Sequence, residues 1–206
     1  MLKERKTQKK TAMDKLIIQG RAKISGNINV PGAKNAALPV MVSSLLSSSG
    51  ICINNLPDLK DIDAMKMLLK SFGVKIKKIK SGTFFDSSNI FYNVADYDLV
   101  RKMRASILVL GPLLAKFNKA KISLPGGCAI GTRPIDIHLK GFEKLGVKFS
   151  FENGFVTGKV KNKLTGNLIN LEFPSVGATE NLMMAAIFAD GETIILNSAK
   201  EPEIKD

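Results

Sequence analysis

The stretch Asp61-Ile-Asp-Ala-Met-Lys-Met-Leu-Leu-Lys-Ser-Phe-Gly-Val-Lys75 decides the fold, because the chain contains it twice. The second copy is Pro134-Ile-Asp-Ile-His-Leu-Lys-Gly-Phe-Glu-Lys-Leu-Gly-Val-Lys148. Self-similarity over a fixed period indicates one supersecondary unit repeated along the chain. A third copy begins at the same period, because Gly32-Ala33 recurs as Gly177-Ala178. We expect this third unit to be incomplete, with Asp206 as its last residue.

Each copy places two helical segments around a strand. In the first copy we expect helices over 36–46 and 62–72, with strands over 51–54 and 74–79. Gly73 follows the second helix, where glycine commonly ends helices. The second copy repeats this order, with helices over 104–117 and 135–145, a strand over 121–124 and a loop over 125–134. The third has a helix opening at 177–180 and a strand over 192–197.

The two helices of a copy differ in polarity. The first is apolar nearly all round and should be buried, whereas the second is amphipathic, with Ile62, Met65, Leu68, Leu69 and Phe72 on one face. These patterns predict an α/β fold of βαβαββ-type units related by pseudo-threefold repetition, truncated within the third unit. The predicted boundaries are about 31–100, 101–172 and 173–206, preceded by a disordered basic tail over 1–12 and short strands over 16–18 and 22–30.

Composition limits the classes of function. The net charge of +13 fits a lysine-rich solvated surface, a nucleic-acid binder or attraction of anionic substrates. Nucleic-acid binding is disfavoured because Trp is absent and only two Tyr are present to stack on bases. No apolar run is long enough to span a membrane. The two cysteines suggest no disulfide framework, and we expect a reducing, cytoplasmic setting.

The chemistry-bearing segment is the loop Leu124-Pro-Gly-Gly-Cys-Ala-Ile-Gly-Thr-Arg-Pro134, which has no counterpart in the first copy. Its glycines should expose Cys128, and the guanidinium of Arg133 five residues away would favour a thiolate. Cys128 is therefore a candidate nucleophile or general acid. Cys52, inside an apolar strand, should instead be a buried residue without chemistry.

Basic residues also recur at the starts of the first helices. Lys34, Arg104 and Thr179 occupy nearly equivalent positions, and helix N-termini suit anions. With Arg133, the basic residues Lys34 and Arg104 predict a site for several phosphates or carboxylates. His138, the only histidine, is either a hydrogen-bonded structural residue or part of this site. We find no spacing of His, Cys and carboxylates typical of a metal site, and neither nucleotide-loop fingerprint.

These segments resemble a known family. The stretches 31–39, 103–106, 124–139, 175–179 and 201–204 are similar to the UDP-N-acetylglucosamine 1-carboxyvinyltransferases, enolpyruvyl transferases of peptidoglycan synthesis, and the likeness runs from about Met13 to Asp206. The resemblance implies an inside-out α/β barrel with two domains, of which only the first is present here. Residues 13–30 would be strands of the second domain, which a separately encoded C-terminal half could supply.

The resemblance also implies roles for single residues. Lys34, Asn35 and Arg133 would bind phosphoenolpyruvate, and Cys128 would be the general acid and the residue alkylated by fosfomycin. The nucleotide sugar would be bound by a larger set, namely Arg104, Arg133, Pro134, Ile135, Asp136, Ile137, Phe173, Pro174, Ser175, Val176 and Gly177. No cofactor, metal, nucleic acid or membrane is implied. The alternatives are a fragment inactive alone, a non-catalytic remnant and a module that binds a nucleotide sugar.

Overall fold

A computed structural model describes residues 16–18, 20–21, 23, 25–92, 94, 97–100, 103–123 and 135–206. The chain divides into two units, residues 1–30 and 31–206. The described residues of the first unit form neither helix nor strand, so the expectation of strands at 16–18 and 22–30 is wrong for them. A strand is stable only beside a paired neighbour, and no pairing is formed by these described residues. The assignment of 13–30 to a second domain stays a prediction.

The first repeat contains two helices and a three-stranded antiparallel sheet. The sheet order is β1-β3-β2, and Cys52 of β1 lies opposite Phe84 of β3. Its elements, in chain order, are α1 (Lys34–Ser43), η1 (Ser44–Leu46), β1 (Ile51–Ile53), α2 (Lys60–Ser71), β2 (Lys75–Ile79) and β3 (Gly82–Asp86). From α1 onward this is the order of the predicted βαβαββ unit, with β2 and β3 as its final pair of strands.

The second repeat has the same plan. Its sheet order is β4-β6-β5, again antiparallel throughout. The helix expected over 104–117 consists of a 3-10 segment followed by an α-helix. The elements are α3 (Tyr97–Val100), η2 (Arg104–Val109), α4 (Leu110–Phe117), β4 (Lys119–Ser123), α5 (Asp136–Lys144), β5 (Lys148–Glu152) and β6 (Phe155–Lys159).

The third repeat is smaller. Strands β7 (Leu168–Asn170) and β8 (Ile194–Leu196) pair in parallel, and α6 (Val176–Ala186) connects them as a βαβ crossover. After β8 the described chain forms only the short helix η3 (Pro202–Ile204). The third repeat therefore has the counterparts of α1 and β1 but not those of α2 and the β2–β3 hairpin.

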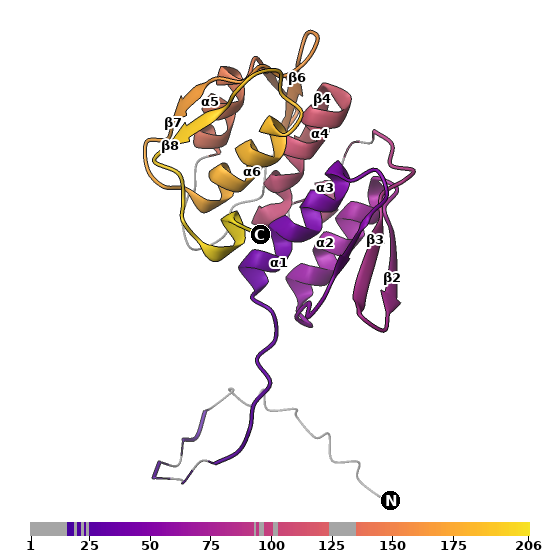
Figure 1. The fold of residues 1–206 in the computed structure, drawn as a ribbon, viewed down its shortest axis with the longest axis vertical. Coiled ribbons are helices and arrows are strands. Elements are labelled where there is room, and N and C mark those ends of the chain that lie inside the picture. Colours follow the sequence, from indigo (N-terminus) through magenta and orange to yellow (C-terminus); the bar gives the residue numbers. More distant parts are fainter. Residues whose placement is uncertain are drawn as a thin grey trace, which may run out of the picture. The chain divides into compact units, whose positions relative to one another are not determined.

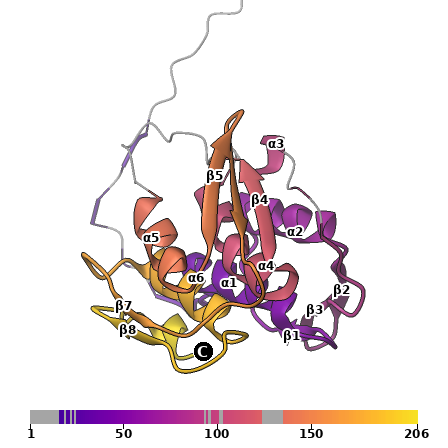
Figure 2. The ribbon, with the colours of Figure 1, turned by 90° about the horizontal axis from the view of Figure 1, so that it is seen from above.

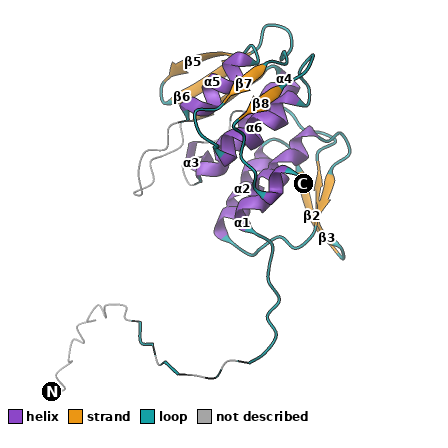
Figure 3. Ribbon diagram, turned by 60° about the vertical axis from the view of Figure 1, so that its left-hand side comes forward, coloured by secondary structure: helices purple, strands orange, loops and turns teal. Residues whose placement is uncertain are grey.

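The first helices of the three repeats form the core. Helix α6 contacts both α4 and α1, and α1 contacts η2 (Figure 1; Figure 3). Viewed from above, these helices lie in the middle with the three sheets around them (Figure 2). Met41, Val42, Leu114 and Ala185 on these helices are fully buried, which confirms the prediction from their apolar pattern. The expected buried face of α2, from Ile62 to Phe72, is also confirmed.

Glycine ends the second helix of each complete repeat in the same way. Gly73 has a φ of +93°, and the N–H groups of Gly73 and Val74 donate to the carbonyls of Lys70 and Leu69. Gly146, with a φ of +91°, repeats this pair of bonds after α5. The pattern is a Schellman motif, which needs a residue that tolerates positive φ. The repeat in sequence is thus a repeat in backbone geometry.

The position of Cys52 corrects one expectation. Cys52 is exposed, whereas its neighbours Ile51 and Ile53 are only partly exposed. Successive side chains of a strand point to opposite faces, so an apolar tripeptide on a half-covered strand must expose one member. The sequence pattern alone did not show that β1 is an edge strand covered on one face.

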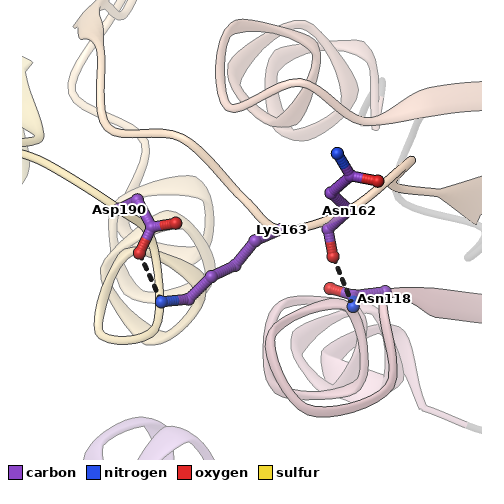
Figure 4. A network of polar contacts seen from close by, with 4 residues as sticks. All are labelled: Asn118, Asn162, Lys163 and Asp190. Carbon is purple, nitrogen blue, oxygen red and sulfur yellow. Dashed lines mark hydrogen bonds and ion pairs between the residues drawn. The ribbon is translucent and has the colours of Figure 1, made fainter.

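Polar contacts bind the second repeat to the third. The segment between β6 and β7 holds Asn162 and Lys163 (Figure 4). The side chain of Asn118, which ends α4, donates to the carbonyl of Asn162 at 2.7 Å, and the ammonium of Lys163 pairs with the carboxylate of Asp190 before β8. This connection therefore fixes α4 and β8 to the same short segment.

Candidate functional site

The expected site residues lie at the starts of four helices. Lys34 and Asn35 begin α1, Arg104 begins η2, and Ile135–Ile137 span the start of α5. Residues 173–177 lead into α6. The helices themselves are in contact, since α1 touches η2 and α6, and α6 touches η2 and α5. Cys128, Arg133 and Pro134 lie outside the described residues, so their expected roles are not tested.

Helices α1 and α4 run in the same direction. Lys116 near the end of α4 donates to the carbonyl of Ser47 at 3.1 Å, just after η1. Since α1 also contacts η2, the beginnings of the two helices lie at the same end of the core. Free N–H groups at such ends attract anions. The arrangement agrees with the anion site expected from the recurrent basic positions.

Lys34 at the first position of α1 forms an ion pair with Asp61 of α2. The ammonium nitrogen lies 2.9 Å from Oδ2, and the two side chains are 45% and 40% exposed. Ala33 gives α1 no side-chain cap, and α1 has no acidic residue in its first turn. The N–H groups of that turn can therefore receive an anion beside the Lys34 ammonium.

The start of α6 is held by Ser175 and Thr179. Ser175 caps the helix by accepting from the N–H of Ala178 at 3.4 Å. The hydroxyl of Thr179 donates to the carbonyl of Ser175 at 2.8 Å and accepts from the N–H of Ala199 at 3.0 Å. Thr179 is buried, and these two hydrogen bonds make it a residue that fixes the turn.

His138 is a buried, hydrogen-bonded residue. Its Nδ1 lies 3.2 Å from the side-chain nitrogen of Asn181 on α6, and its ring packs near Gly177. Burial lowers the pKa of His138 to about 4, so the imidazole is neutral at pH 7. The alternative of a hydrogen-bonded structural histidine is confirmed by these contacts, although the ring lies beside two of the expected site segments.

Glu180, the next residue after Thr179, is a buried carboxyl. Its Oε1 has no hydrogen-bond partner among the described residues. Burial, followed by the charges of Glu203 and Glu201, raises the pKa of Glu180 to about 7. A large part of the population thus carries a protonated carboxyl at neutral pH.

Two surface cavities lie near the starts of α5 and α6. One, of about 360 Å³, is lined by residues 197–201 and by Pro174. The other, of about 400 Å³, lies between α5 and β7 and includes Ile137. Lys140 and Glu172 pair at 2.5 Å beside the second cavity. Each cavity is thus bordered by one of the residues expected to bind the nucleotide sugar.

Within the described part of the chain, no three His, Cys, Asp or Glu side chains are grouped so as to hold a metal ion. No described helix has the length and apolarity needed to cross a membrane.

Sequence reasoning missed Asp61 and Asn181. Asp61 has Pro134 as its counterpart in the second copy, and this difference between copies was a usable signal. Asn181 is a fully buried amide on α6. A polar residue at a core position must find partners, and that requirement was the available signal.

Comparison with known proteins decides the family. Residues 18–206 match the family EPSP synthase (3-phosphoshikimate 1-carboxyvinyltransferase). The chain belongs to the EPSP synthase family. Among solved structures, the enolpyruvyl transferase NikO from Streptomyces tendae matches with a TM-score of 0.76 at 20% identity, over 88% of this chain and 43% of that one. EPSP synthase from Acinetobacter baumannii matches with a TM-score of 0.69 at 18% identity, over 87% and 42%. The α/β fold class of the enolpyruvyl transferases is confirmed.

Curated relatives are closer in sequence. UDP-N-acetylglucosamine 1-carboxyvinyltransferase from Pseudoalteromonas atlantica is 50% identical over 94% of this chain and 46% of its own length. A second protein of that name, from Granulibacter bethesdensis, is 50% identical over 94% of this chain and 47% of its own. This family member therefore spans about half the length of the curated relatives it matches.

Proposed function

We propose that this chain provides the substrate-binding half of a UDP-N-acetylglucosamine 1-carboxyvinyltransferase. The reaction moves the enolpyruvyl group of phosphoenolpyruvate to the 3-hydroxyl of UDP-N-acetylglucosamine, for peptidoglycan synthesis. The observation that carries the proposal is the identity of about 50% to proteins of that name across 94% of the chain. The grouping of helix starts with basic residues supports it, because both substrates are anionic.

In the proposal, phosphoenolpyruvate binds at the start of α1. Lys34 and Asn35 are the exposed first residues of that helix, and the N–H groups of the first turn are available to a phosphate. Asp61 holds the Lys34 ammonium at this end. Arg133, from outside the described residues, supplies the second cation in the proposal.

In the proposal, the nucleotide sugar binds along the starts of η2, α5 and α6. Arg104 would meet the diphosphate, while the segments 134–137 and 173–177 would line the nucleoside. The exposed Phe173 and the cavity beside Pro174 offer room and apolar surface there. Each of these roles is a proposal carried over from the similar family.

In the proposed reaction, the sugar 3-hydroxyl adds to C2 of phosphoenolpyruvate, and the Cys128 thiol gives its proton to C3. The hydroxyl proton passes to a base, and a tetrahedral ketal forms. Removal of a proton from the new methyl group then restores the double bond as the C2–O bond to phosphate breaks. Phosphate leaves with that electron pair, so the step needs no redox partner or cofactor.

We further propose that catalysis needs a second domain, because the relatives are about twice as long as this chain. That domain, encoded with or apart from these residues, would close over the helix starts and complete the site. A cytoplasmic location is part of the proposal, as are the roles of such enzymes in cell-wall growth and division.

Two measurements test the function. Calorimetry should detect binding of UDP-N-acetylglucosamine to the chain, while phosphate release from the two substrates should be absent without a complementing half. Fosfomycin, followed by peptide mass spectrometry, should label Cys128 and spare the exposed Cys52, which serves as an internal control. Labelling that is equal at both thiols, or faster at Cys52, would contradict the assigned role of Cys128.

The second candidate is a module that binds the nucleotide sugar without catalysis. It is favoured by the coverage of less than half of each relative. Adding the remaining half of the Pseudoalteromonas atlantica relative as a separate polypeptide separates the two. Restored phosphate release supports the transferase, whereas binding without any restored release supports the module.

A further inference from the structure

The side chain of Asn181 takes the place of a helical hydrogen bond. In a continuous α-helix, the N–H of Gly111 would donate to the carbonyl of Ile107, four residues earlier. Here the Gly111 N–H donates to Asn181 Oδ1 at 2.7 Å, and Asn181 Nδ2 donates to the Ile107 carbonyl at 2.9 Å. The 3-10 segment η2 changes to α4 at this point. An inserted side chain is a recognised cause of such a break.

Glycine lets α6 approach both neighbouring helices here. A Cβ at Gly111 would lie 2.6 Å from Asn181 Oδ1, and a Cβ at Gly141 of α5 would lie 2.8 Å from a methyl of Leu182. Both distances are far below van der Waals contact. The approach of α6 to α4 therefore requires glycine at position 111, because a Cβ there would also meet the backbone carbonyl of Asn181, whereas the methyls that Gly141 faces belong to a flexible leucine side chain.

The backbone also determines the proton on His138. Because Gly111 can only donate and Ile107 can only accept, the orientation of the Asn181 amide is fixed. Its second N–H then points to His138 Nδ1, which must accept. In a neutral imidazole the proton consequently lies on Nε2, the nitrogen on the side of Gly177.

One buried amide thus joins three of the segments that the proposed function uses. Ile107 follows Arg104 by three residues, His138 directly follows Ile137, and Asn181 lies one turn after Gly177. We propose that Asn181 is a positioning residue for the nucleotide-sugar site: it fixes the starts of η2, α5 and α6 relative to one another and keeps the His138 proton on Nε2. This inference rests on the proposed function.

The test uses the full chain and its only histidine. A long-range ¹H–¹⁵N spectrum of the wild type at pH 7 should show the Nε2–H tautomer. In Asn181→Asp, a carboxylate oxygen faces the Ile107 carbonyl and His138 Nδ1, so the imidazole should gain a proton on Nδ1. Calorimetry below the unfolding temperature should show about tenfold weaker binding of UDP-N-acetylglucosamine, or about 1.4 kcal/mol.

Asn118→Asp is the matched control. It also replaces a hydrogen-bonded asparagine, at the other end of α4. This variant should keep both the tautomer and the affinity. If Asn181→Asp does not fold, His138→Phe keeps a ring but removes the acceptor, and should weaken binding severalfold while leaving the Gly111 amide resonance in place.

The possible results separate the two proposals. A wild-type Nδ1–H tautomer, or an Asn181→Asp chain that binds within twofold of the wild type, would overturn the positioning role. A wild-type chain that does not bind the nucleotide sugar would overturn the proposed function and the positioning role with it. In that case the tautomer would still show whether the amide network itself is correct.

Discussion

The second and third repeats begin alike and end differently. In the second, Ile122 of β4 is fully buried in a three-stranded sheet. In the third, Ile194 and Leu196 of β8 are each 46% exposed, and Ile187 at the end of α6 is 65% exposed. Both repeats thus place a helical segment before a strand, although that segment begins as a 3-10 helix only in the second, and burial depends on what packs next to them. Local structure follows the repeat, but the hydrophobic contribution to stability does not.

The largest predicted effect is the difference in the free energy of unfolding between a substitution in the core of the second repeat and one in the third. Phe142 of α5 is fully buried and lies 6.3 Å from the ring of Phe149, so Phe142→Ala should lower the free energy of unfolding by about 3–5 kcal/mol. The exposed Ile194→Ala should change it by less than about 0.5 kcal/mol. Urea unfolding monitored by circular dichroism measures both. Equal losses would show that the third repeat is buried to the same degree in solution.

The second predicted effect is a pH dependence of stability caused by His138, which is buried in the second repeat. The folded-state pKa of His138, about 4, lies below its ordinary value of 6.5, so the unfolded chain binds the proton more readily. Stability should be full above pH 6.5 and fall as the pH decreases toward 4, by at most about 3 kcal/mol. Urea midpoints from pH 7 to pH 4, with His138→Gln as the reference, measure this slope. A slope unchanged in that variant would contradict the assignment.

The third predicted effect is a pH dependence of stability with the opposite sign, caused by Glu180, which is buried in the third repeat. The pKa of Glu180 is raised to about 7, so the folded chain retains the proton and stability falls as the pH rises from about 4.5 through 7. Glu180→Gln should therefore add roughly 1–2 kcal/mol at pH 8, allowing for partial solvent screening, and little at pH 4.5. Thermal melts at the two pH values decide it. Stabilisation that is equal at both would exclude titration as the cause.

How much of the fold could be predicted from the sequence depends on how far apart in the sequence the contacting residues lie. The helix end at Gly73 and the buried face of α2 are local patterns, and their predictions are confirmed. The exposure of Cys52 and the burial of Thr179 depend on which elements cover them, which a single strand or turn does not encode. Asn181 escaped notice because its partners, Ile107, Gly111 and His138, are distant in sequence.

For the candidate site, the repeat pattern pointed to the starts of α1, η2 and α6 and the family resemblance added the start of α5, and the structure brings these helices into contact. It did not identify Asp61, because an ion pair between two helices depends on their packing. The roles of all the candidate site residues, including Cys128, Arg133 and Pro134, stay predictions.

The smallest predicted effect concerns the first repeat, where Asp61 stands in place of Pro134. The Lys34–Asp61 pair is partly exposed, so Asp61→Asn should lower the free energy of unfolding by less than about 0.5 kcal/mol. If Asp61 serves to hold Lys34, the same variant should still weaken phosphoenolpyruvate binding, measured by calorimetry with nucleotide sugar present. A large loss of stability would instead make the pair part of the fold.

The contacts of Asn162 and Lys163 bear on where foreign sequence could be added to this protein. An epitope placed between those two residues would pull α4 and β8 apart, since each is fastened to one of them. The tight Asn153-Gly154 turn between β5 and β6 makes no such contact with another described element, and no described atom lies within 4 Å of the place a Cβ would take on Gly154. Labels, reporters or surface attachments for single-molecule work therefore belong at that hairpin tip.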